Sequence, residues 1–493
     1  METILNYIGG KWQPALNGST RKVSDPADGS VVGIVTDSHV EDARLAITAA
    51  REAFLGAGTW RLTPAPLRAQ VLYRVADGIL SRIDELAELD SRNNGKPLRE
   101  ARCDVEDAAA CFRYYAGLIS APQGGVYDVT DAFGPMHAFS MHEPVGVCAL
   151  ITPWNYPVLM AAWKLAPSLA AGNCVVFKPS ELTPLSAAIL FRIMEQAGLP
   201  PGTANLVLGT GPNVGAELAA SNDVDMITFT GSTRTGQSIA TAAVGNLKKV
   251  GLELGGKSPN IIFSDADLEG AVEWAMFGVF FNQGEVCSAG ARILVQDSIK
   301  DAFVNRLAER ATKMTIGRGL DNPDMGPLIS AAHLDKVTGF VERAREEGAK
   351  LVCGGGRLSE GALSKGFFMA PTILDECRPE MEIVREEVFG PVASIQTFET
   401  EEQAIAMAND TRYGLAGGVF TTDGARALRV VKALRAGVTW INCYNPTFNE
   451  APWGGYKMSG YGRDLGVNGL LEYQQVKQVN TNLRPGPFGW YTR

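Results

Sequence analysis

From residue 145 onward, short and almost continuously apolar runs alternate with longer intervals of helical composition. Strands that are apolar on both faces, separated by helices, are typical of a parallel sheet covered by helices on both sides. The alternation therefore predicts an α/β fold with a doubly wound parallel sheet. The predicted strands are 145–151, 174–177, 205–208, 226–229, 250–254 and 260–263, and the predicted helices between them are 158–171, 184–197, 213–220 and 233–244.

Other parts of the chain extend this pattern at both ends. A second α/β series runs to about residue 440, and its first elements are a helix at 266–281, a strand at 292–295 and helices at 298–312 and 331–347. Residues 39–121 have helical periodicity, with helices expected after Glu41, at 66–90 and at 99–118. Residues 121–144 are polar and rich in glycine and proline, which indicates a hairpin or linker. A chain of 493 residues with this organisation is expected to form two or three domains.

Composition excludes several classes of protein. The net charge of −9 argues against a general nucleic-acid or anionic-membrane binder. The uncharged stretch 144–163 is interrupted by Pro153 and Pro157, so no membrane span is expected. The N-terminus has no secretory pattern, and the eight cysteines form no CxxC pair. We therefore expect a cytoplasmic protein without a zinc site or a disulfide framework.

Four turns at strand ends bear on whether the chain binds a dinucleotide. The GxGxxG fingerprint is absent from the turn after the first strand, which reads Thr152-Pro153-Trp154-Asn155. The glycines at 209–215 have the wrong spacing and suit a strand-to-helix turn, whereas 229–236 could offer backbone N–H groups and the Ser232 hydroxyl to a phosphate. Lys178 and Glu181 follow the second strand, where an acid can bind ribose hydroxyls or simply close a surface ion pair.

Cys287, Glu253 and Asn155 are candidates for catalysis. Cys287 lies in a polar, glycine-containing loop that could expose a reactive thiol, although most cysteines are buried hydrophobes. Glu253 ends an apolar strand and is either a general base or a buried carboxylate capping the following glycines. Asn155 offers an amide donor to an oxyanion, or forms an Asx turn. Neither Cys287 nor Glu253 has a histidine nearby, which disfavours a Cys-His hydrolase.

Together these segments resemble the aldehyde dehydrogenase superfamily over residues 7–480, and most closely its betaine-aldehyde and aminoaldehyde subgroup. The resemblance implies two doubly wound parallel-sheet domains plus a small β element for oligomerisation. The motifs that carry it are Pro153-Trp-Asn-Tyr-Pro157, Lys178-Pro-Ser-Glu181, Phe229-Thr-Gly-Ser232, Leu252-Glu-Leu-Gly-Gly-Lys-Ser-Pro259, Gly284-Glu-Val-Cys287, Glu386-Glu-Val-Phe-Gly-Pro391 and Pro452-Trp-Gly-Gly-Tyr-Lys457.

The resemblance implies a catalytic role for each candidate. Cys287 would attack an aldehyde, and the Asn155 amide with the Cys287 backbone N–H would bind the resulting oxyanion. After hydride transfer to a nicotinamide, Glu253 would activate the water that hydrolyses the thioester. Lys164 and Asp464 match a lysine–acid pair that carries protons away from the glutamate, with aspartate here where that branch has glutamate.

The resemblance also implies NAD as cofactor. Lys178 and Glu181 would hold the adenosine ribose, Gly231 and Ser232 would lie at the pyrophosphate, and Glu387 would contact the nicotinamide ribose. The carboxylate of Glu181 favours NAD over NADP because it repels a 2′-phosphate, although a swing of this side chain could still admit NADP. The full set of implied cofactor residues is Thr152, Pro153, Trp154, Lys178, Ser180, Glu181, Gly211, Gly231, Ser232, Leu254, Glu387 and Phe389.

The implied substrate tunnel contains an aromatic group that attracts alkylammonium ions. Its aromatic members are Tyr156, Trp163 and Trp453, and Asp104 and Asp107 match acidic residues at the entrance of aminoaldehyde enzymes. The two aspartates could equally form a solvated helix face. The tunnel would also contain Phe281, Val286, Ser288 and Thr447.

Two departures from plant members favour a broader aminoaldehyde enzyme over a trimethylammonium specialist. Phe281 occupies a position at which plant members commonly have tryptophan, and Thr447 occupies a position at which they have cysteine. A broad aliphatic or aromatic aldehyde dehydrogenase is the alternative. A CoA-acylating enzyme is disfavoured by Glu253, and a non-enzymatic protein of the same fold by the presence of both Cys287 and Glu253.

The domain division expected from the resemblance has three parts. An NAD-binding domain comprises 1–121 and 144–255, and a catalytic domain comprises 256–455. An oligomerisation element comprises 122–143 and 472–485, whose strand edges a second subunit would cover. We therefore expect a homodimer or homotetramer that acts on a small aldehyde.

Overall fold

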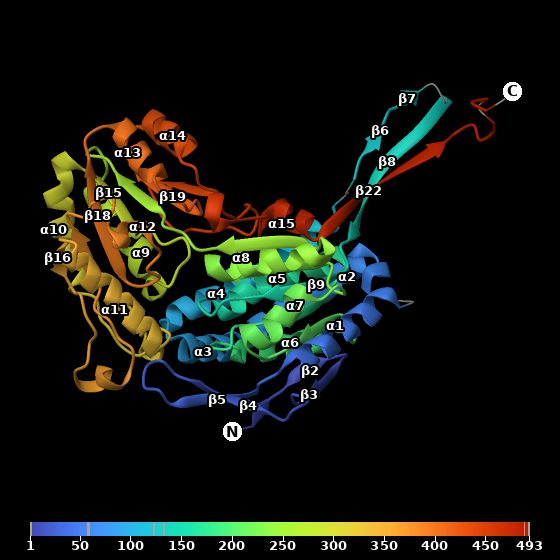
Figure 1. Cartoon of the computed structure of the whole chain (residues 1–493), viewed down its shortest axis with the longest axis horizontal. Coiled ribbons are helices and arrows are strands. Elements are labelled where there is room, and N and C mark those ends of the chain that lie inside the picture. The colour runs from blue at the N-terminus through green and yellow to red at the C-terminus, as the bar shows by residue number, and fades with distance from the viewer. Residues whose placement is uncertain (1, 57–59, 122–123, 132–133, 488, 492–493) are drawn as a thin grey trace.

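The structure is a computed structural model that describes residues 2–56, 60–121, 124–131, 134–487 and 489–491. Two large sheets lie in separate parts of the molecule, and a long β arm extends away from them (Figure 1). Within the described residues, no helix combines the length and apolarity needed to cross a membrane.

An eight-stranded sheet carries most of the predicted site residues. Its strands occur in the order β21 (Gly460–Tyr461), β13 (Lys249–Leu254), β12 (Met226–Gly231), β9 (Val147–Ile151), β10 (Cys174–Lys178), β11 (Ala204–Leu206), β2 (Asn6–Ile8) and β3 (Lys11–Gln13). The five strands from β13 to β11 are parallel, as predicted, whereas β21, β2 and β3 add antiparallel edges that the sequence pattern did not predict. The fold class is therefore confirmed, with mixed pairing at both edges of this sheet.

Helices cover both faces of this sheet because both faces of its strands are apolar. Val147, Ala149 and Ile151 of β9 belong to one core cluster, and the alternate residues Cys148 and Leu150 belong to the cluster on the opposite face. The first cluster includes α1 (Val40–Leu55), α7 (Ala216–Ala220) and α8 (Thr233–Ala243). The second includes α2 (Ala65–Ser81), α4 (Leu98–Leu118), α5 (Pro157–Ala171) and α6 (Leu185–Gln196).

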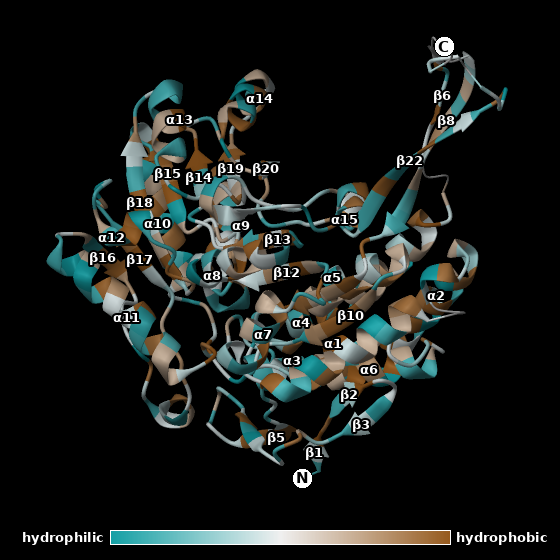
Figure 2. Ribbon diagram, turned by 45° about the vertical axis from the view of Figure 1, so that its right-hand side comes forward, coloured by the Kyte–Doolittle hydropathy of each residue, from teal (hydrophilic) through white to brown (hydrophobic). Residues whose placement is uncertain are grey.

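The second sheet has seven strands in the order β16 (Lys350–Cys353), β17 (Thr372–Asp375), β18 (Val392–Phe398), β15 (Arg292–Gln296), β14 (Pro259–Ile262), β19 (Ala416–Phe420) and β20 (Val438–Ile441). Neighbouring strands are parallel except for β16 and β17. Its apolar strands, brown in Figure 2, lie between helices with polar outer faces. These helices are α9 (Leu268–Phe280), α10 (Lys300–Ala311), α11 (Ala331–Glu346), α12 (Glu382–Arg385), α13 (Glu401–Asn409) and α14 (Gly424–Ala433).

The arm joins two segments that are distant in sequence. β8 (Gly134–Pro144) pairs antiparallel with β22 (Gln474–Asn482), from Gln474 opposite Pro144 to Asn482 opposite Met136. β6 (Val126–Tyr127) and β7 (Thr130–Asp131) pair with the other edge of β8, and α15 (Gly466–Glu472) leads into β22. Residues 122, 123, 132 and 133 of the predicted hairpin lie outside the described residues. The predicted pairing of hairpin and C-terminal strand is confirmed for the rest.

The helical predictions for residues 39–121 need one correction. The single helix expected at 66–90 is two helices, α2 and α3 (Ile83–Asn94), separated at Arg82, whose backbone is non-helical (φ −122°, ψ 26°). Apolar residues keep a helical spacing across this break, so periodicity alone did not reveal it. A small sheet of β1 (Thr3–Ile4), β4 (Thr20–Ser24) and β5 (Val31–Thr36) precedes the helices and was not predicted.

Candidate active site

A cavity of about 620 Å³ lies beyond the carboxyl ends of β9, β12 and β13. Ligands of open parallel sheets bind at this end of the strands. The predicted site residues that line the cavity are Asp104, Asp107, Pro153, Trp154, Asn155, Tyr156, Trp163, Gly231, Ser232, Glu253, Leu254, Phe281, Val286, Cys287, Ser288, Glu387, Phe389, Thr447, Trp453 and Asp464. The predicted residues outside this lining are Thr152, Lys164, Lys178, Ser180, Glu181 and Gly211.

Cys287 follows a tight loop between α9 and β15. Its side chain is half-buried, and burial together with the carboxylates of Glu387 and Glu253 raises the pKa of the thiol to about 12. The loop packs closely against Gly256, just after β13. A Cβ added at Gly256 would lie only 2.8 Å from the Cys287 carbonyl oxygen. A glycine at 256 is thus required for the thiol to sit beside Glu253. A thiol with a raised pKa needs a base in order to react.

Asn155 is buried at the turn before α5. Its Nδ2 donates a hydrogen bond to the Glu285 carbonyl oxygen (2.8 Å), in the same loop as Cys287. An amide nitrogen has two hydrogens, so the second remains for an oxygen atom in the cavity. The contact anchors the predicted oxyanion donor directly to the loop of the predicted nucleophile.

Glu253 ends β13, and its two carboxylate oxygens have no hydrogen-bond partner among the described residues. Burial, followed by the nearby carboxylate of Asp464, raises the pKa of Glu253 well above its ordinary value. A carboxyl group of this kind is a strong proton acceptor once it is ionised. The geometry therefore suits a general base more than the alternative of a cap on the glycine turn.

Lys164 and Asp464 form a buried pair beside Glu253. The Lys164 Nζ donates to Asp464 Oδ2 (3.1 Å) and to Thr228 Oγ1 (2.9 Å). Asp464 lines the large cavity, and its backbone exchanges two hydrogen bonds with Trp453. Lys164 lies behind Asp464, outside the cavity lining. The pair thus adjoins the buried carboxyl group, as the resemblance implied.

One end of the cavity offers groups suited to a phosphate and a ribose. Ser232 caps the N-terminus of α8 by accepting from the Thr235 N–H, and Gly231 precedes it. Thr230 Oγ1 is buried there without a hydrogen-bond partner among the described residues. Glu387 Oε1 accepts from the Gly256 N–H (3.1 Å), and burial raises the pKa of Glu387 to about 7. Exposed N–H groups at a helix start and an unpaired hydroxyl fit a dinucleotide.

The remaining predicted cofactor residues gather at the end of the neighbouring strand β10. Lys178 Nζ donates to Glu181 Oε2 (3.3 Å), and the Lys178 carbonyl accepts from the Thr152 N–H (3.2 Å). Ser180 Oγ accepts from the Leu182 N–H (3.2 Å). Gly211 begins the single turn Gly211–Gly215, whose last residue adjoins the Lys178 side chain. These residues form a second polar patch next to the cavity, and both interpretations of Lys178 and Glu181 agree with it.

The predicted aromatic group lies in the cavity wall. Trp163 and Trp453 meet edge to face, with ring centroids 5.7 Å apart, and Tyr156 belongs to the same lining. Phe281 is tilted against Phe277 at 4.6 Å, and Ser288 Oγ donates to Asn445 Oδ1 (3.1 Å). The wall is aromatic and hydroxyl-bearing, without an arginine in the lining.

Asp104 and Asp107 lie on one face of α4 but in different environments. Asp104 is buried and forms a 2.5 Å ion pair with Lys96 Nζ, which also lies 3.9 Å from the centroid of the Tyr156 ring. Asp107 is exposed and lines the cavity. Burial, followed by the charge of Asp104, raises the pKa of Asp107 to about 6. Both aspartates line the cavity, as the resemblance implied for entrance carboxylates, but only Asp104 is paired with a buried lysine.

Sequence reasoning missed several lining residues. His333 and Lys336, on the first turns of α11, line the end of the cavity near Phe389. His333 Nε2 contacts the Phe389 carbonyl oxygen at 2.6 Å, and burial lowers the pKa of His333 to about 4. A neutral histidine and a lysine one helical turn apart share a face. The spacing of His333 and Lys336 was the one feature of the sequence that could have drawn attention to them, and it does not indicate which ligand they would bind.

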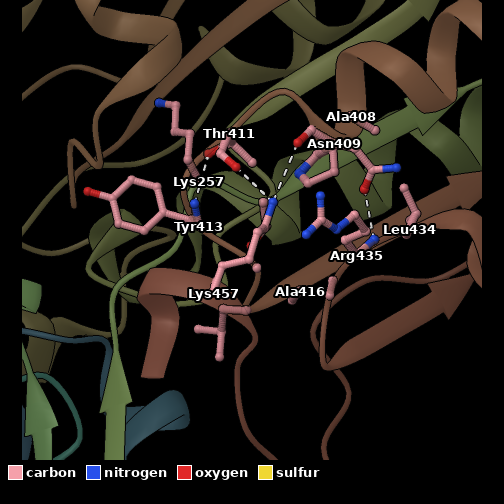
Figure 3. A pocket seen from close by; sticks show the side chains of 14 residues that line it. Lys257, Ala408, Asn409, Thr411, Tyr413, Ala416, Leu434, Arg435 and Lys457 are labelled. Carbon is pink, nitrogen blue, oxygen red and sulfur yellow. Dashed lines mark hydrogen bonds between the residues drawn. The ribbon is translucent and has the colours of Figure 1, made fainter. Parts of the chain in front are cut away.

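A second, much smaller cavity lies near Lys457 (Figure 3). Lys457 Nζ donates to the carbonyl oxygens of Thr411 (2.7 Å) and Asn409 (3.4 Å). Its volume of about 10 Å³ suffices for roughly one water molecule. It is therefore a packing feature rather than a substrate site.

A half-buried thiol, a buried carboxyl group and an anchored amide lie in one cavity beyond the ends of parallel strands, which defines an enzyme that works through a cysteine nucleophile. The sequence model of the "Aldehyde dehydrogenase family" matches residues 12–479. The chain belongs to this family, and the predicted family, fold class and aldehyde-oxidising activity are confirmed.

Individual relatives are similar over their whole length. The chain is 48% identical over 486 residues to betaine aldehyde dehydrogenase of Bacillus subtilis, covering 98% of this chain and 99% of that protein. It is 45% identical over 492 residues to aminoaldehyde dehydrogenase 2 of Zea mays, covering 98% and 96%. A crystal structure of betaine aldehyde dehydrogenase from Staphylococcus aureus in complex with NAD+ superposes with a TM-score of 0.97 at 44% identity, covering 99% of this chain and 96% of that chain.

Proposed function

We propose that this aldehyde dehydrogenase uses NAD to oxidise betaine aldehyde or ω-aminoaldehydes, which carry a positive charge, to the corresponding carboxylic acids. The observation that carries the proposal is the placement of Cys287 in one cavity with the aromatic group and Asp107. The names of the relatives, betaine aldehyde and aminoaldehyde dehydrogenases, agree with it.

In the first half of the reaction, Cys287 attacks the aldehyde carbon. The thiol proton passes to Glu253, because a thiol with a pKa near 12 is otherwise protonated at neutral pH. The new C–S bond turns the carbonyl oxygen into an oxyanion, which the free Asn155 N–H and the Cys287 backbone N–H stabilise. This thiohemiacetal places the aldehyde hydrogen on a tetrahedral carbon, from which it can leave as hydride.

In the second half, the cysteine thioester is hydrolysed. The proton taken from the thiol first leaves Glu253 through Asp464 and Lys164. Glu253 then takes a proton from water, the hydroxide adds to the thioester carbon and the C–S bond breaks. The acid product leaves and the thiolate is regenerated. Asp464 and Lys164 adjoin Glu253 and are positioned to pass its proton onward.

The cofactor proposal is NAD. When bound, NAD supplies the hydride acceptor. Gly231, Ser232 and Thr230 would hold its pyrophosphate, and Glu387 would hold the nicotinamide ribose beside Phe389 and Trp154. Lys178 and Glu181 would bind the adenosine ribose, with Thr152, Pro153, Ser180, Gly211 and Leu254 forming the surrounding surface. The Glu181 carboxylate disfavours a 2′-phosphate, so NADP should bind more weakly.

The substrate proposal rests on charge and shape. The faces of Tyr156, Trp163 and Trp453 attract an alkylammonium group, by about 0.5–2 kcal/mol each when water is excluded. Asp107 adds a negative charge at the mouth of the cavity. A broad-specificity aliphatic or aromatic aldehyde dehydrogenase remains the alternative. Phe281 and Thr447 favour a broader aminoaldehyde enzyme over a trimethylammonium specialist.

Organisation and location belong to the same proposal. We assign 1–121 and 144–255 to NAD binding, 256–455 to catalysis and 122–143 with 472–485 to oligomerisation. The arm carries exposed apolar residues such as Val126, Tyr127 and Val476, which a second subunit would cover. We propose a cytoplasmic homodimer or homotetramer.

A matched pair of substrates tests the charge. Betaine aldehyde and 3,3-dimethylbutanal have the same shape, but the neutral compound has carbon where the cation has nitrogen. We expect kcat/KM to be at least about tenfold higher for the cation, equivalent to 1.4 kcal/mol in the transition state. Equal values, or a preference for hexanal and benzaldehyde, would establish the broad-specificity alternative.

A further inference from the structure

The loop before Cys287 contains three consecutive residues in the left-handed conformation. Asn282, Gln283 and Gly284 have φ values of 48°, 57° and 71°. Gly284 is required there, since a Cβ would lie 2.3 Å from the Gly390 carbonyl oxygen. Asn282 and Gln283 are not glycine, so their conformation is unfavourable unless contacts from outside the loop stabilise it.

One such contact comes from α4. Glu100 lies in the first turn of α4, is 6% exposed, and its Oε2 accepts the Asn282 backbone N–H at 2.9 Å. The two residues are 182 positions apart in the chain. Asn282 is fully buried, so without Glu100 its N–H would lack a partner away from water.

Asn282 connects this contact to the reacting groups. Its Nδ2 donates to the carbonyl oxygens of Asn155 (3.0 Å) and Glu285 (3.3 Å). Asn155 Nδ2 donates to that same Glu285 carbonyl oxygen (2.8 Å). Cys287 lies two residues after Glu285 in the chain. The nucleophile and the oxyanion donor are thus held to each other through Asn282.

We propose that Glu100 is a positioning residue for catalysis, which fixes the left-handed turn at Asn282 and thereby sets the distance between the Cys287 thiol and the Asn155 amide. Glu100 does not line the cavity, so it would act through Asn282 and not by contact with the reacting atoms. The inference rests on the proposed chemistry of Cys287 and adds a residue on α4 that controls it.

The test compares isosteric variants by the rate constant of the NADH burst per titrated active site. Glu100→Met removes the acceptor and should lower this rate roughly 10- to 100-fold, since misplacement by about 1 Å can lower a rate 10²-fold. Glu100→Gln keeps a carbonyl acceptor and should stay within about threefold of wild type. The rate at which iodoacetamide alkylates Cys287, measured by peptide mass spectrometry, should change in parallel with the burst rate across these variants.

A matched control separates positioning from general loss of stability. Asp42 is 2% exposed and its carboxylate accepts the backbone N–H groups of Leu16 and His39, but it lies outside the cavity lining. Asp42→Leu should lower the melting temperature and leave the burst rate per site unchanged. If Glu100→Met does not fold, Glu100→Asp withdraws the carboxylate by one methylene and should also slow the burst.

A double-mutant cycle with Asn282→Ala provides the decisive comparison. Because both residues act through one chain of contacts, the double variant should be little slower than the worse single variant. Additive losses, a normal burst rate in Glu100→Met or Glu100→Asp, or equal impairment in Glu100→Gln and Glu100→Met would overturn the inference. Absence of aldehyde oxidation by the wild type would instead refute the proposed function, and Cys287 alkylation would still report on Glu100.

Discussion

Replacing Glu253 by glutamine separates the two halves of the proposed reaction. The side chain keeps its shape but can no longer accept a proton. General-base catalysis contributes about 10²- to 10⁴-fold, so steady-state turnover should fall by this factor, equivalent to about 3–5 kcal/mol. Hydride transfer precedes hydrolysis, so a burst of about one NADH per active site should persist in amplitude, but it should form more slowly because glutamine cannot take the thiol proton.

The structure also predicts how this variant responds to pH. Burial raises the pKa of Glu253, so wild-type turnover should increase with pH as the carboxyl group loses its proton. The same shift affects folding. A raised pKa adds to the free energy of unfolding, and this added stability is fully present below the pKa of the unfolded chain, near 4.3. It is lost as the pH rises through the higher pKa of the folded state. Glu253→Gln lacks this loss and should be at least as stable as wild type at neutral pH.

Rapid-quench or stopped-flow measurement of NADH, with thermal melting at two pH values, checks both expectations. The reasoning fails if the variant turns over at the wild-type rate. It also fails if the variant melts far below wild type, because Glu253 would then be a structural residue whose carboxylate stabilises the fold. Loss of the burst with turnover would place the essential role of Glu253 in thiol activation instead of hydrolysis.

The remaining predictions concern the other groups around the cavity. Asn155→Ala should lower the burst rate about 10²- to 10³-fold because it removes an oxyanion donor. The affinity for NAD, measured by fluorescence titration, should stay unchanged. A normal burst rate would exclude this role of Asn155. Asp107→Asn should raise KM for aminoaldehydes and leave KM for hexanal unchanged, whereas Asp104→Asn should chiefly lower the melting temperature, because it leaves Lys96 buried without its ion-pair partner. Reversed effects would show that Asp104 is the substrate carboxylate. Glu181→Ala should improve kcat/KM for NADP relative to NAD; an unchanged ratio would show that this carboxylate does not select the cofactor.

Much of the fold and the central chemistry could be predicted from local sequence. β9 and β10 are almost continuously apolar because helices cover both faces of the sheet, and this burial is visible residue by residue in the sequence. Asn155 follows β9, Glu253 lies near the end of the apolar strand β13 and Cys287 lies in the polar loop after α9, so these three candidates could be named before their positions were known. The short antiparallel strands β2 and β21 were missed because two or three residues carry no measurable period.

Only the tertiary structure decided how charges and hydrogen bonds are partnered. In sequence Asp104 and Asp107 look alike and both line the cavity, but Asp104 is buried and paired with Lys96, which also lies against the Tyr156 ring, whereas Asp107 is exposed. Glu100 reaches Asn282 across 182 residues, and His333 meets the Phe389 carbonyl across 56. The sequence by itself determined which groups could react, since burial and strand position depend on neighbouring residues. Their geometry and electrostatics depend on contacts between segments that are distant in the chain, and those contacts exist only once both sheets and their helices have packed.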